Sequence, residues 1–261
     1  MPNRFVRLAL LALAVAVPPV VGHAQAAPKS SAAQAPSKQT PDLSGVWDRG
    51  EKAQMVSYVL SDLSGMKGDN PPMTPWGEAQ FKQTKPSQGI RASDHPNDTT
   101  TFQCMPPGLP RIYMEPHPMQ ILQTPGRVVM LFEFDHFFRT IYTDGRDHPK
   151  DLDSTWMGNA IGHWEADTLV VDTIGFNDKT WIDRAGHPHS DQLHLVERIR
   201  RVDPATLQDD ITIEDPKAYT KPWNTRKMFK LRPDWELLED VCEGQGDYLN
   251  LEKQVGIEPS K

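Results

Sequence analysis

Side chains that can move protons gather in the second half of the chain. Six histidines fall between His136 and His194, and the segment 175–191 is rich in Asn, Asp, His and Trp. Long polar loops on a rigid scaffold often carry function, although a solvated loop that only caps the fold is the structural alternative. Histidine titrates near neutral pH without any perturbation, so the pattern predicts acid/base chemistry.

The predicted catalytic residues are groups that could transfer or stabilise a proton: His136, Arg139, Tyr142, His189, Asp191 and His194. A second set could bind the substrate: Asn177, Asp178, Trp181, Arg198 and Tyr219. In an unbroken strand, Phe134, His136, Phe138 and Tyr142 would share one face, where an apolar wall could tune the pKa of His136. A core histidine bonded to a backbone carbonyl is the alternative at that position.

A metal site is the main competing interpretation. His187 and His189 form a His-x-His pair, which in an extended chain places both imidazoles on one side. Glu197 is eight residues beyond His189, too far for the glutamate that usually completes such a site, and Pro188 favours a turn. We therefore expect no metal and no cofactor, and keep a metal-dependent hydrolase using His187, His189 and His194 as an alternative.

Several sequence motifs are absent from the chain. It contains no Gly-x-Ser-x-Gly elbow, no phosphate-cradling glycine loop, no dinucleotide fingerprint and no His-Glu-x-x-His. The usual hydrolase, kinase, dehydrogenase and metalloprotease interpretations lose support, which leaves cofactor-free acid/base chemistry or binding.

Residues 1–26 have the pattern of a secretory signal peptide. Arg4 and Arg7 precede an apolar run at 8–21, and the segment 24–26 supplies a small-x-small cleavage site. The run is shorter than the ~20 residues that a bilayer span needs. We therefore expect a periplasmic or secreted protein that has no membrane association after cleavage.

Charge and composition limit the classes of partner that the protein could bind. The leader has two arginines and no acid, so the remaining chain has 26 basic against 35 acidic residues, a formal charge of −9. Such a balance argues against a nucleic-acid partner and against an anionic membrane surface. The segment 27–41 is rich in Ala, Ser, Pro, Lys and Gln, which predicts a disordered linker.

Short apolar runs separated by turn residues dominate the segment 42–261, which we interpret as one domain. The expected strands are 43–47, 119–123, 127–134, 137–142, 162–165, 168–173, 192–202, 208–214, 225–231 and 236–242. The spacing predicts a mainly β fold, an antiparallel lipocalin-like β-barrel with long loops. Thr74 and Pro75 predict a short helix over 74–81, with Thr74 as its cap.

Two further details follow from residue types. Period-two alternation places Leu195, Glu197 and Ile199 on one face of the strand at 192–202 and His194 and Arg198 on the other.

Cys104 and Cys242 are the only cysteines, and in an exported chain we expect them to form a disulfide.

Several segments resemble a family of exported, lipocalin-like bacterial proteins, most of which have no assigned activity. They are PDLSGVW at 41–47, CMPPGLP at 104–110, IYTDGR at 141–146, WMG at 156–158, TLVVDT at 168–173, GHPHSD at 186–191 and AYTKPW at 218–223. The resemblance spans nearly all of the chain after the leader and implies export and a barrel fold.

The chain also resembles γ-formaldehyde lyases that act on lignin-derived phenylcoumarans, although no catalytic residue can be carried over from them. That resemblance implies a cofactor-independent lyase whose substrate is a small aromatic molecule. Such a reaction needs a base for an alcohol proton, a group that manages charge on the ring, and exclusion of water. A lipocalin-like binding protein without turnover is the alternative.

Overall fold

The computed structural model describes residues 40–49, 71–87 and 91–242. The predicted signal peptide at 1–26 and most of the predicted linker at 27–41 lie outside the described residues. Within the described ranges, no helix is long and apolar enough to cross a membrane.

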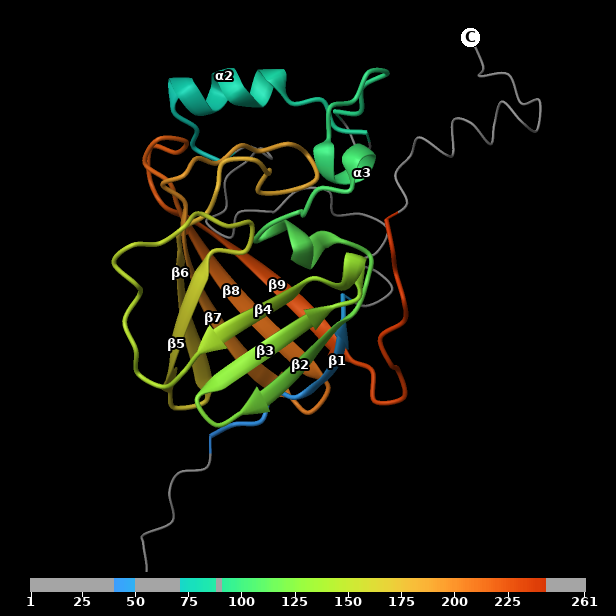
Figure 1. The fold of residues 1–261 in the computed structure, drawn as a ribbon, viewed down its shortest axis with the longest axis vertical. Helices are drawn as coiled ribbons and strands as arrows, with labels where there is room; N and C mark the ends of the chain where they lie inside the picture. The colour runs from blue at the N-terminus through green and yellow to red at the C-terminus, as the bar shows by residue number, and fades with distance from the viewer. Residues whose placement is uncertain (1–39, 50–70, 88–90, 243–261) are drawn as a thin grey trace, which may run out of the picture. The chain divides into compact units, whose positions relative to one another are not determined.

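Nine strands form a closed barrel in which β9 returns to pair with β1 (Figure 1). The strands are β1 (Gly45–Asp48), β2 (Met119–Thr124), β3 (Arg127–Phe132), β4 (Phe138–Tyr142), β5 (Asn159–Glu165), β6 (Thr168–Ile174), β7 (His194–Asp203), β8 (Thr206–Glu214) and β9 (Trp223–Leu231). The predicted mainly β, lipocalin-like barrel is confirmed. The residues expected to form a strand at 236–242 have no regular secondary structure.

One pair of strands departs from the predicted antiparallel order. β4 and β5 are parallel, with Ile141 opposite Ala160 and Tyr142 opposite Ile161. The chain makes no hairpin after β4, although Asp144-Gly145 is a common hairpin turn. Instead residues 143–158, the outer crossover, pass along the outside of the barrel before β5 begins (Figure 1).

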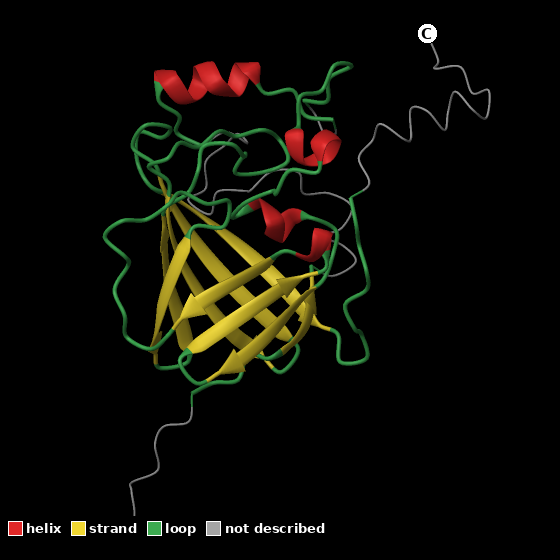
Figure 2. Ribbon diagram, in the orientation of Figure 1, coloured by secondary structure: helices red, strands yellow, loops and turns green. Residues whose placement is uncertain are grey.

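The two ends of the barrel are built differently. Three tight turns, at 125–126, 166–167 and 204–205, join strands at one end. The opposite, loop-covered end carries the segments 71–87, 91–118, 133–137, 175–193 and 215–222, together with all the helices of the described chain (Figure 2). A site built from loops therefore belongs at this end.

Two helices and two 3-10 turns lie at the loop-covered end: α2 (Pro75–Gln83), α3 (Thr99–Gln103), η1 (Arg111–Met114) and η2 (Phe134–His136). α2 confirms the predicted helix, because the Thr74 hydroxyl accepts a hydrogen bond from the Gly77 N–H and Pro75 is the first helical residue. Asp98 caps α3 in the same way through the Thr100 N–H. η1 is fully buried and closes the barrel.

Bulky apolar side chains fill most of the barrel interior. Ile121, Met130, Val171, Ile211 and Phe229 are among the buried residues that alternate with more exposed ones along their strands. Their period of two follows from the pleat of the backbone.

A smaller set of inward-facing residues is charged: Arg139, Glu197, Asp209 and Lys227. The predicted face of β7 is confirmed, because Leu195, Glu197 and Ile199 are buried. Charged groups that face into a barrel need partners, because an isolated charge is costly to bury.

Cys104 and Cys242 form the predicted disulfide, with a Cα–Cα distance of 5.5 Å. Cys104 is the last-turn cap of α3, and Cys242 ends the segment 232–242, the C-terminal strap. The Cys242 N–H donates to the Asp135 carboxylate, and the Leu238 N–H donates to the Glu133 carboxylate. The strap is thereby fastened to the loop-covered end.

Candidate active site at the loop-covered end

A pocket of about 150 Å³ lies between α2 and the loop 175–193. Its lining residues are Trp76, Gln80, Thr84, Asp178, Lys179, Thr180, Trp181, Pro188 and His189. Three of the predicted site residues, Asp178, Trp181 and His189, meet in it. Two indole rings and several polar groups around one small space are the composition expected of a small-molecule site.

His189 and Thr180 form the most reactive arrangement in this pocket. The Nδ1 atom of His189 lies 3.1 Å from the backbone oxygen of Ser190, which can only accept, so Nδ1 carries the proton. The Nε2 atom is then the free base, and the Thr180 hydroxyl donates to it over 2.6 Å. A hydroxyl on an oriented imidazole is the general pattern of an activated nucleophile or a proton relay.

Burial sets the protonation state of His189. The side chain is fully enclosed, and loss of hydration lowers its pKa below the ordinary value of 6.5, while the hydrogen bond to Ser190 and the charges of Asp215 and Asp178 oppose that shift. The imidazole is therefore neutral at pH 7 and can accept a proton.

The loop 175–193 holds His189 by folding back on itself. Trp181 and Pro188 form an isolated antiparallel bridge, and the Ile182 N–H donates to the His187 carbonyl over 2.8 Å. The Tyr219 hydroxyl donates to the Pro188 carbonyl over 2.7 Å. Tyr219, predicted to bind substrate, thus supports this loop from the segment 215–222, which joins β8 to β9.

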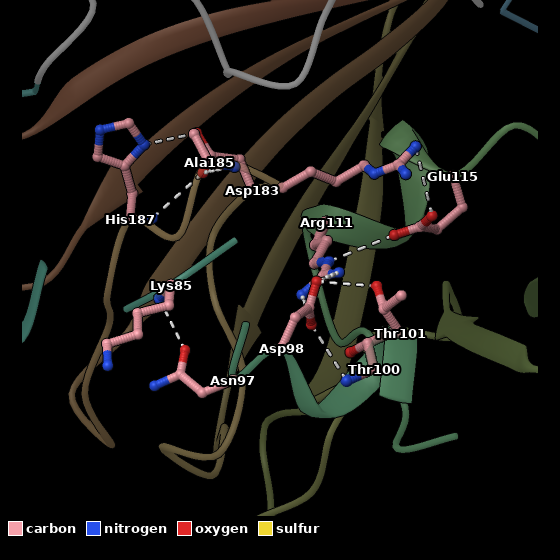
Figure 3. Close-up of polar contacts among 11 residues, drawn as sticks. Lys85, Asn97, Asp98, Thr100, Thr101, Arg111, Glu115, Asp183, Ala185 and His187 are labelled. Carbon is pink, nitrogen blue, oxygen red and sulfur yellow. Dashed lines mark hydrogen bonds and ion pairs between the residues drawn. The ribbon is translucent and has the colours of Figure 1, made fainter. Parts of the chain in front are cut away.

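His187 has a different environment from His189. Its Nδ1 lies 2.6 Å from the Asp183 carboxylate (Figure 3). Its ring stacks on that of Phe81, with the ring centroids 4.5 Å apart. Asp183 also accepts from the backbone N–H groups of Ala185 and His187. These contacts fasten the loop to α2, so His187 helps to build the pocket wall.

A buried ion pair holds the segment between α3 and η1. The Arg111 guanidinium donates to both oxygens of Asp98, at 2.9 and 2.7 Å, and to Glu115 at 3.3 Å (Figure 3). The guanidinium also lies 5.5 Å from the Trp181 ring centroid. Arg111 was not predicted, because the sequence around it shows only a proline-rich loop.

Arg139, predicted to be catalytic, lies inside the barrel. It forms a bidentate ion pair with Glu197, and its guanidinium donates to the Tyr113 hydroxyl over 2.7 Å and to Thr173 over 2.8 Å. The Tyr113 hydroxyl donates to Glu197 over 2.9 Å. Every partner is buried, so this network joins η1 to the barrel wall.

His194 belongs to a cluster on the outer wall. Its Nε2 and Nδ1 lie 2.9 and 3.0 Å from the carboxylates of Asp172 and Glu214. Asp172 also contacts His148 of the outer crossover at 2.9 Å, and His148 contacts Asn159 at 2.7 Å. The cluster ties the crossover to β5 and β6.

The remaining predicted residues lie apart from the pocket or support it. His136 is exposed in η2 with a left-handed backbone (φ 55°), so the expected face shared with Phe134, Phe138 and Tyr142 does not form. Tyr142 lies under the Arg146 guanidinium, 3.9 Å from its ring centroid.

Three more predicted residues have local partners. Arg198 donates to Glu165 on the exposed outer wall over 2.8 Å. Asp191 is exposed, 4.0 Å from the Lys217 ammonium. Asn177 is buried and accepts from the Lys179 N–H over 3.1 Å, which orders the chain just before the pocket residues.

His187, His189 and His194 do not form the metal site considered as an alternative. Among the described residues, no group of three or more His, Cys, Asp or Glu side chains has a geometry that could hold a metal ion. Each of the three histidines has its own separate partners.

A larger cavity, of about 430 Å³, runs beside the C-terminal strap. Asp48, His117, Glu133 and Trp235 are among its lining residues, and none of the predicted site residues is among them. His117 contacts the Glu133 carboxylate there, with its Nδ1 3.3 Å from the nearer oxygen.

No family model, curated protein or solved structure matches the chain. The function therefore has to be inferred from the chemistry of the site itself.

Proposed function

We propose that this protein is an exported, cofactor-independent enzyme that performs lyase-type acid/base chemistry on a small aromatic molecule. The observation that supports it is the hydrogen bond between Thr180 Oγ1 and His189 Nε2 at the wall of a pocket flanked by Trp76 and Trp181. A neutral, oriented imidazole supplies the base, and the indole rings supply a surface for an aromatic ring.

The size of the pocket limits what can enter. A cavity of ~150 Å³ is enough for about one benzene ring, and the pocket has that volume. A substrate with two rings would place one ring between Trp76 and Trp181 and leave the other outside.

In a formaldehyde-releasing reaction, the Thr180 hydroxyl would take the proton of a primary alcohol as it passes its own proton to His189 Nε2. The carbon–carbon bond beside the alcohol carbon breaks as the formaldehyde carbonyl forms, and the released electron pair makes a carbon–carbon double bond and expels an ether-linked phenolate. The proton held by His189 then passes to the phenolate oxygen. Lys179 lines the same pocket, and its ammonium would stabilise the developing charge if it turned toward the phenolate.

Turnover of aryl ethers that carry a hydroxymethyl side chain tests this proposal. Formaldehyde and the unsaturated product would be measured for the wild type, His189→Gln and Thr180→Val, with His163→Gln as the matched control because His163 is exposed on β5. Loss of a general base lowers kcat by roughly 10²–10⁴-fold, so we expect that loss for His189→Gln and normal turnover for His163→Gln.

The pH profile gives a second readout of the same site. Because the pKa of His189 lies below 6.5, kcat/KM should be constant near neutral pH and fall only in acid. Normal turnover by His189→Gln would overturn the assignment of the base. Tight binding of the aryl ethers without any product would instead favour the carrier function, and loss of activity with EDTA that zinc restores would favour metal-dependent chemistry.

A further inference from the structure

The larger cavity, of about 430 Å³, has a volume typical of small-molecule sites and plays no part in the proposed function. One of its walls comes from the rim of the barrel and the loop after η1, and includes Asp48, Pro116 and Pro118. The other wall is the C-terminal strap, which contributes Trp235 and Leu238. The cavity is therefore formed where the strap passes the barrel.

Side-chain contacts fix the strap wall in place. The Leu238 N–H donates to the Glu133 carboxylate over 2.8 Å. The Arg232 guanidinium donates to Asp48 over 3.1 Å and lies 4.9 Å from the centroid of the Trp235 ring. Trp235 is thus held at the rim of the barrel, yet it remains 45% exposed. Part of its ring surface is available to a ligand.

His117 supplies an oriented ring nitrogen to the cavity. Its ring packs edge-on against Phe134, and its Nδ1 lies 3.3 Å from the Glu133 carboxylate and 3.9 Å from that of Asp240. Carboxylates accept hydrogen bonds, so Nδ1 carries a proton and Nε2 is the acceptor of the neutral ring. Within the ranges that the structure describes, no protein group bonds to Nε2. A ligand that donates a hydrogen bond would satisfy this atom.

Charge around the cavity favours one kind of donor. Four carboxylates line it, those of Asp48, Glu133, Asp234 and Glu236. Two guanidinium groups offset part of this charge, that of Arg49 in the lining and that of Arg232, which pairs with Asp48. Among the described residues, Asp234 and Glu236 take part in no hydrogen bond or ion pair. The remaining negative charge attracts a donor that carries a positive charge.

We infer that this cavity binds a small organic cation, an amine whose ammonium group donates to His117 Nε2 beside the Glu133 carboxylate while its apolar body contacts Trp235. The carboxylate supplies the opposite charge, and an indole ring both attracts cations and packs against apolar groups. The cavity shares no lining residue with the Thr180–His189 pocket, so the inference does not depend on the proposed function.

Calorimetric titration of the folded full chain with three probes of similar size tests the inference. At pH 7 phenethylamine is a cation, phenethyl alcohol is a neutral donor and phenylacetate is an anion. We expect phenethylamine to bind at least about tenfold more tightly than phenethyl alcohol, because hydrogen bonds between charged groups are stronger than those of a neutral donor. Phenylacetate should not bind, and added salt should weaken the binding of phenethylamine.

Four variants locate the bound amine. Glu133→Gln removes the charge but keeps an oxygen that can accept from the strap, so the affinity for phenethylamine should fall at least about tenfold while the strap stays in place. His117→Phe keeps a ring beside Phe134 but removes Nε2, and Trp235→Leu removes the indole; both should weaken binding. Glu165→Gln is the matched control, because Glu165 is exposed on β5 and pairs with Arg198.

Trp76→Leu separates the two pockets, because Trp76 lines only the smaller one. This variant should bind phenethylamine as the wild type does. Loss of binding in Trp76→Leu but not in Trp235→Leu would place the amine in the smaller pocket and overturn the inference. Equal affinity for the amine and the alcohol, or no saturable binding of phenethylamine, would also overturn it. The comparison of the three probes on the wild type stands even if a variant does not fold, and none of these results depends on turnover by His189.

Discussion

Arg139 of β4 and Glu197 of β7 form an ion pair across the inside of the barrel, with both side chains almost completely buried. Removing one partner of such a pair strands an uncompensated charge and typically costs about 3–5 kcal/mol, whereas replacing both with apolar residues costs far less. We expect Arg139→Met and Glu197→Met each to lower the free energy of unfolding by about that amount in urea titrations. The double variant should recover most of the loss; a double variant as unstable as the sum of the singles would show that the two residues act independently and would contradict this account.

The disulfide gives the second prediction. Free-thiol titration of the denatured, unreduced protein should find no reactive cysteine, and the Cys104→Ser/Cys242→Ser variant should be less stable by about 2–5 kcal/mol. The bond closes a long chain loop, since the two cysteines are 138 positions apart. Two reactive thiols per chain in the wild type would refute the pairing.

The outer-wall cluster predicts a pH dependence of stability. Burial opposes the charge on His194, but its hydrogen bonds to Asp172 and Glu214 raise its pKa above 6.5. A raised folded pKa contributes stability that is complete below pH 6.5 and is lost as the pH rises through the folded value. The wild type should therefore exceed His194→Gln in unfolding free energy by on the order of 1 kcal/mol at pH 6, and the gap should close by pH 9. A gap that is equal at both pH values would contradict the assignment.

Gly108 packs closely against Thr180, a residue of the pocket wall. Its backbone is left-handed (φ +69°), and an added Cβ would lie 2.8 Å from Thr180 Oγ1 and 3.0 Å from the Trp156 carbonyl. Gly108→Ala should lower stability by about 1–3 kcal/mol from backbone strain and should also lower turnover, because Thr180 must move. Gly145→Ala is the matched control: its backbone is also left-handed (φ +83°), but an added Cβ meets nothing within 4 Å. Equal turnover in the two variants would show that Thr180 tolerates displacement.

Local residue patterns were enough to predict most of the barrel. Alternation on β7, the turn residues between strands and the Thr74-Pro75 start of α2 each have a local physical cause, and each is confirmed. The direction of β5 relative to β4 has no local cause, because Asp144-Gly145 fits a hairpin and the chain between the strands decides otherwise. The expected strand at 236–242 failed for a similar reason, since the disulfide and Glu133 hold that segment in place of a sheet partner.

The site could be predicted only where residues are neighbours in sequence. Asp178, Trp181 and His189 share one loop, and the structure brings them into one pocket. Trp76 reaches that pocket from α2, more than a hundred positions away, and no local pattern links the two segments.

The count of strands explains the outer crossover. A ring in which every strand opposes both neighbours can close only with an even number of members, and this barrel has nine. Parity therefore demands at least one parallel neighbour pair, and the chain places it between β4 and β5, while its first and last strands meet antiparallel. The crossover at 143–158 meets this demand: a version shortened to a hairpin could close a nine-strand ring only if another neighbour pair, such as β9 and β1, became parallel.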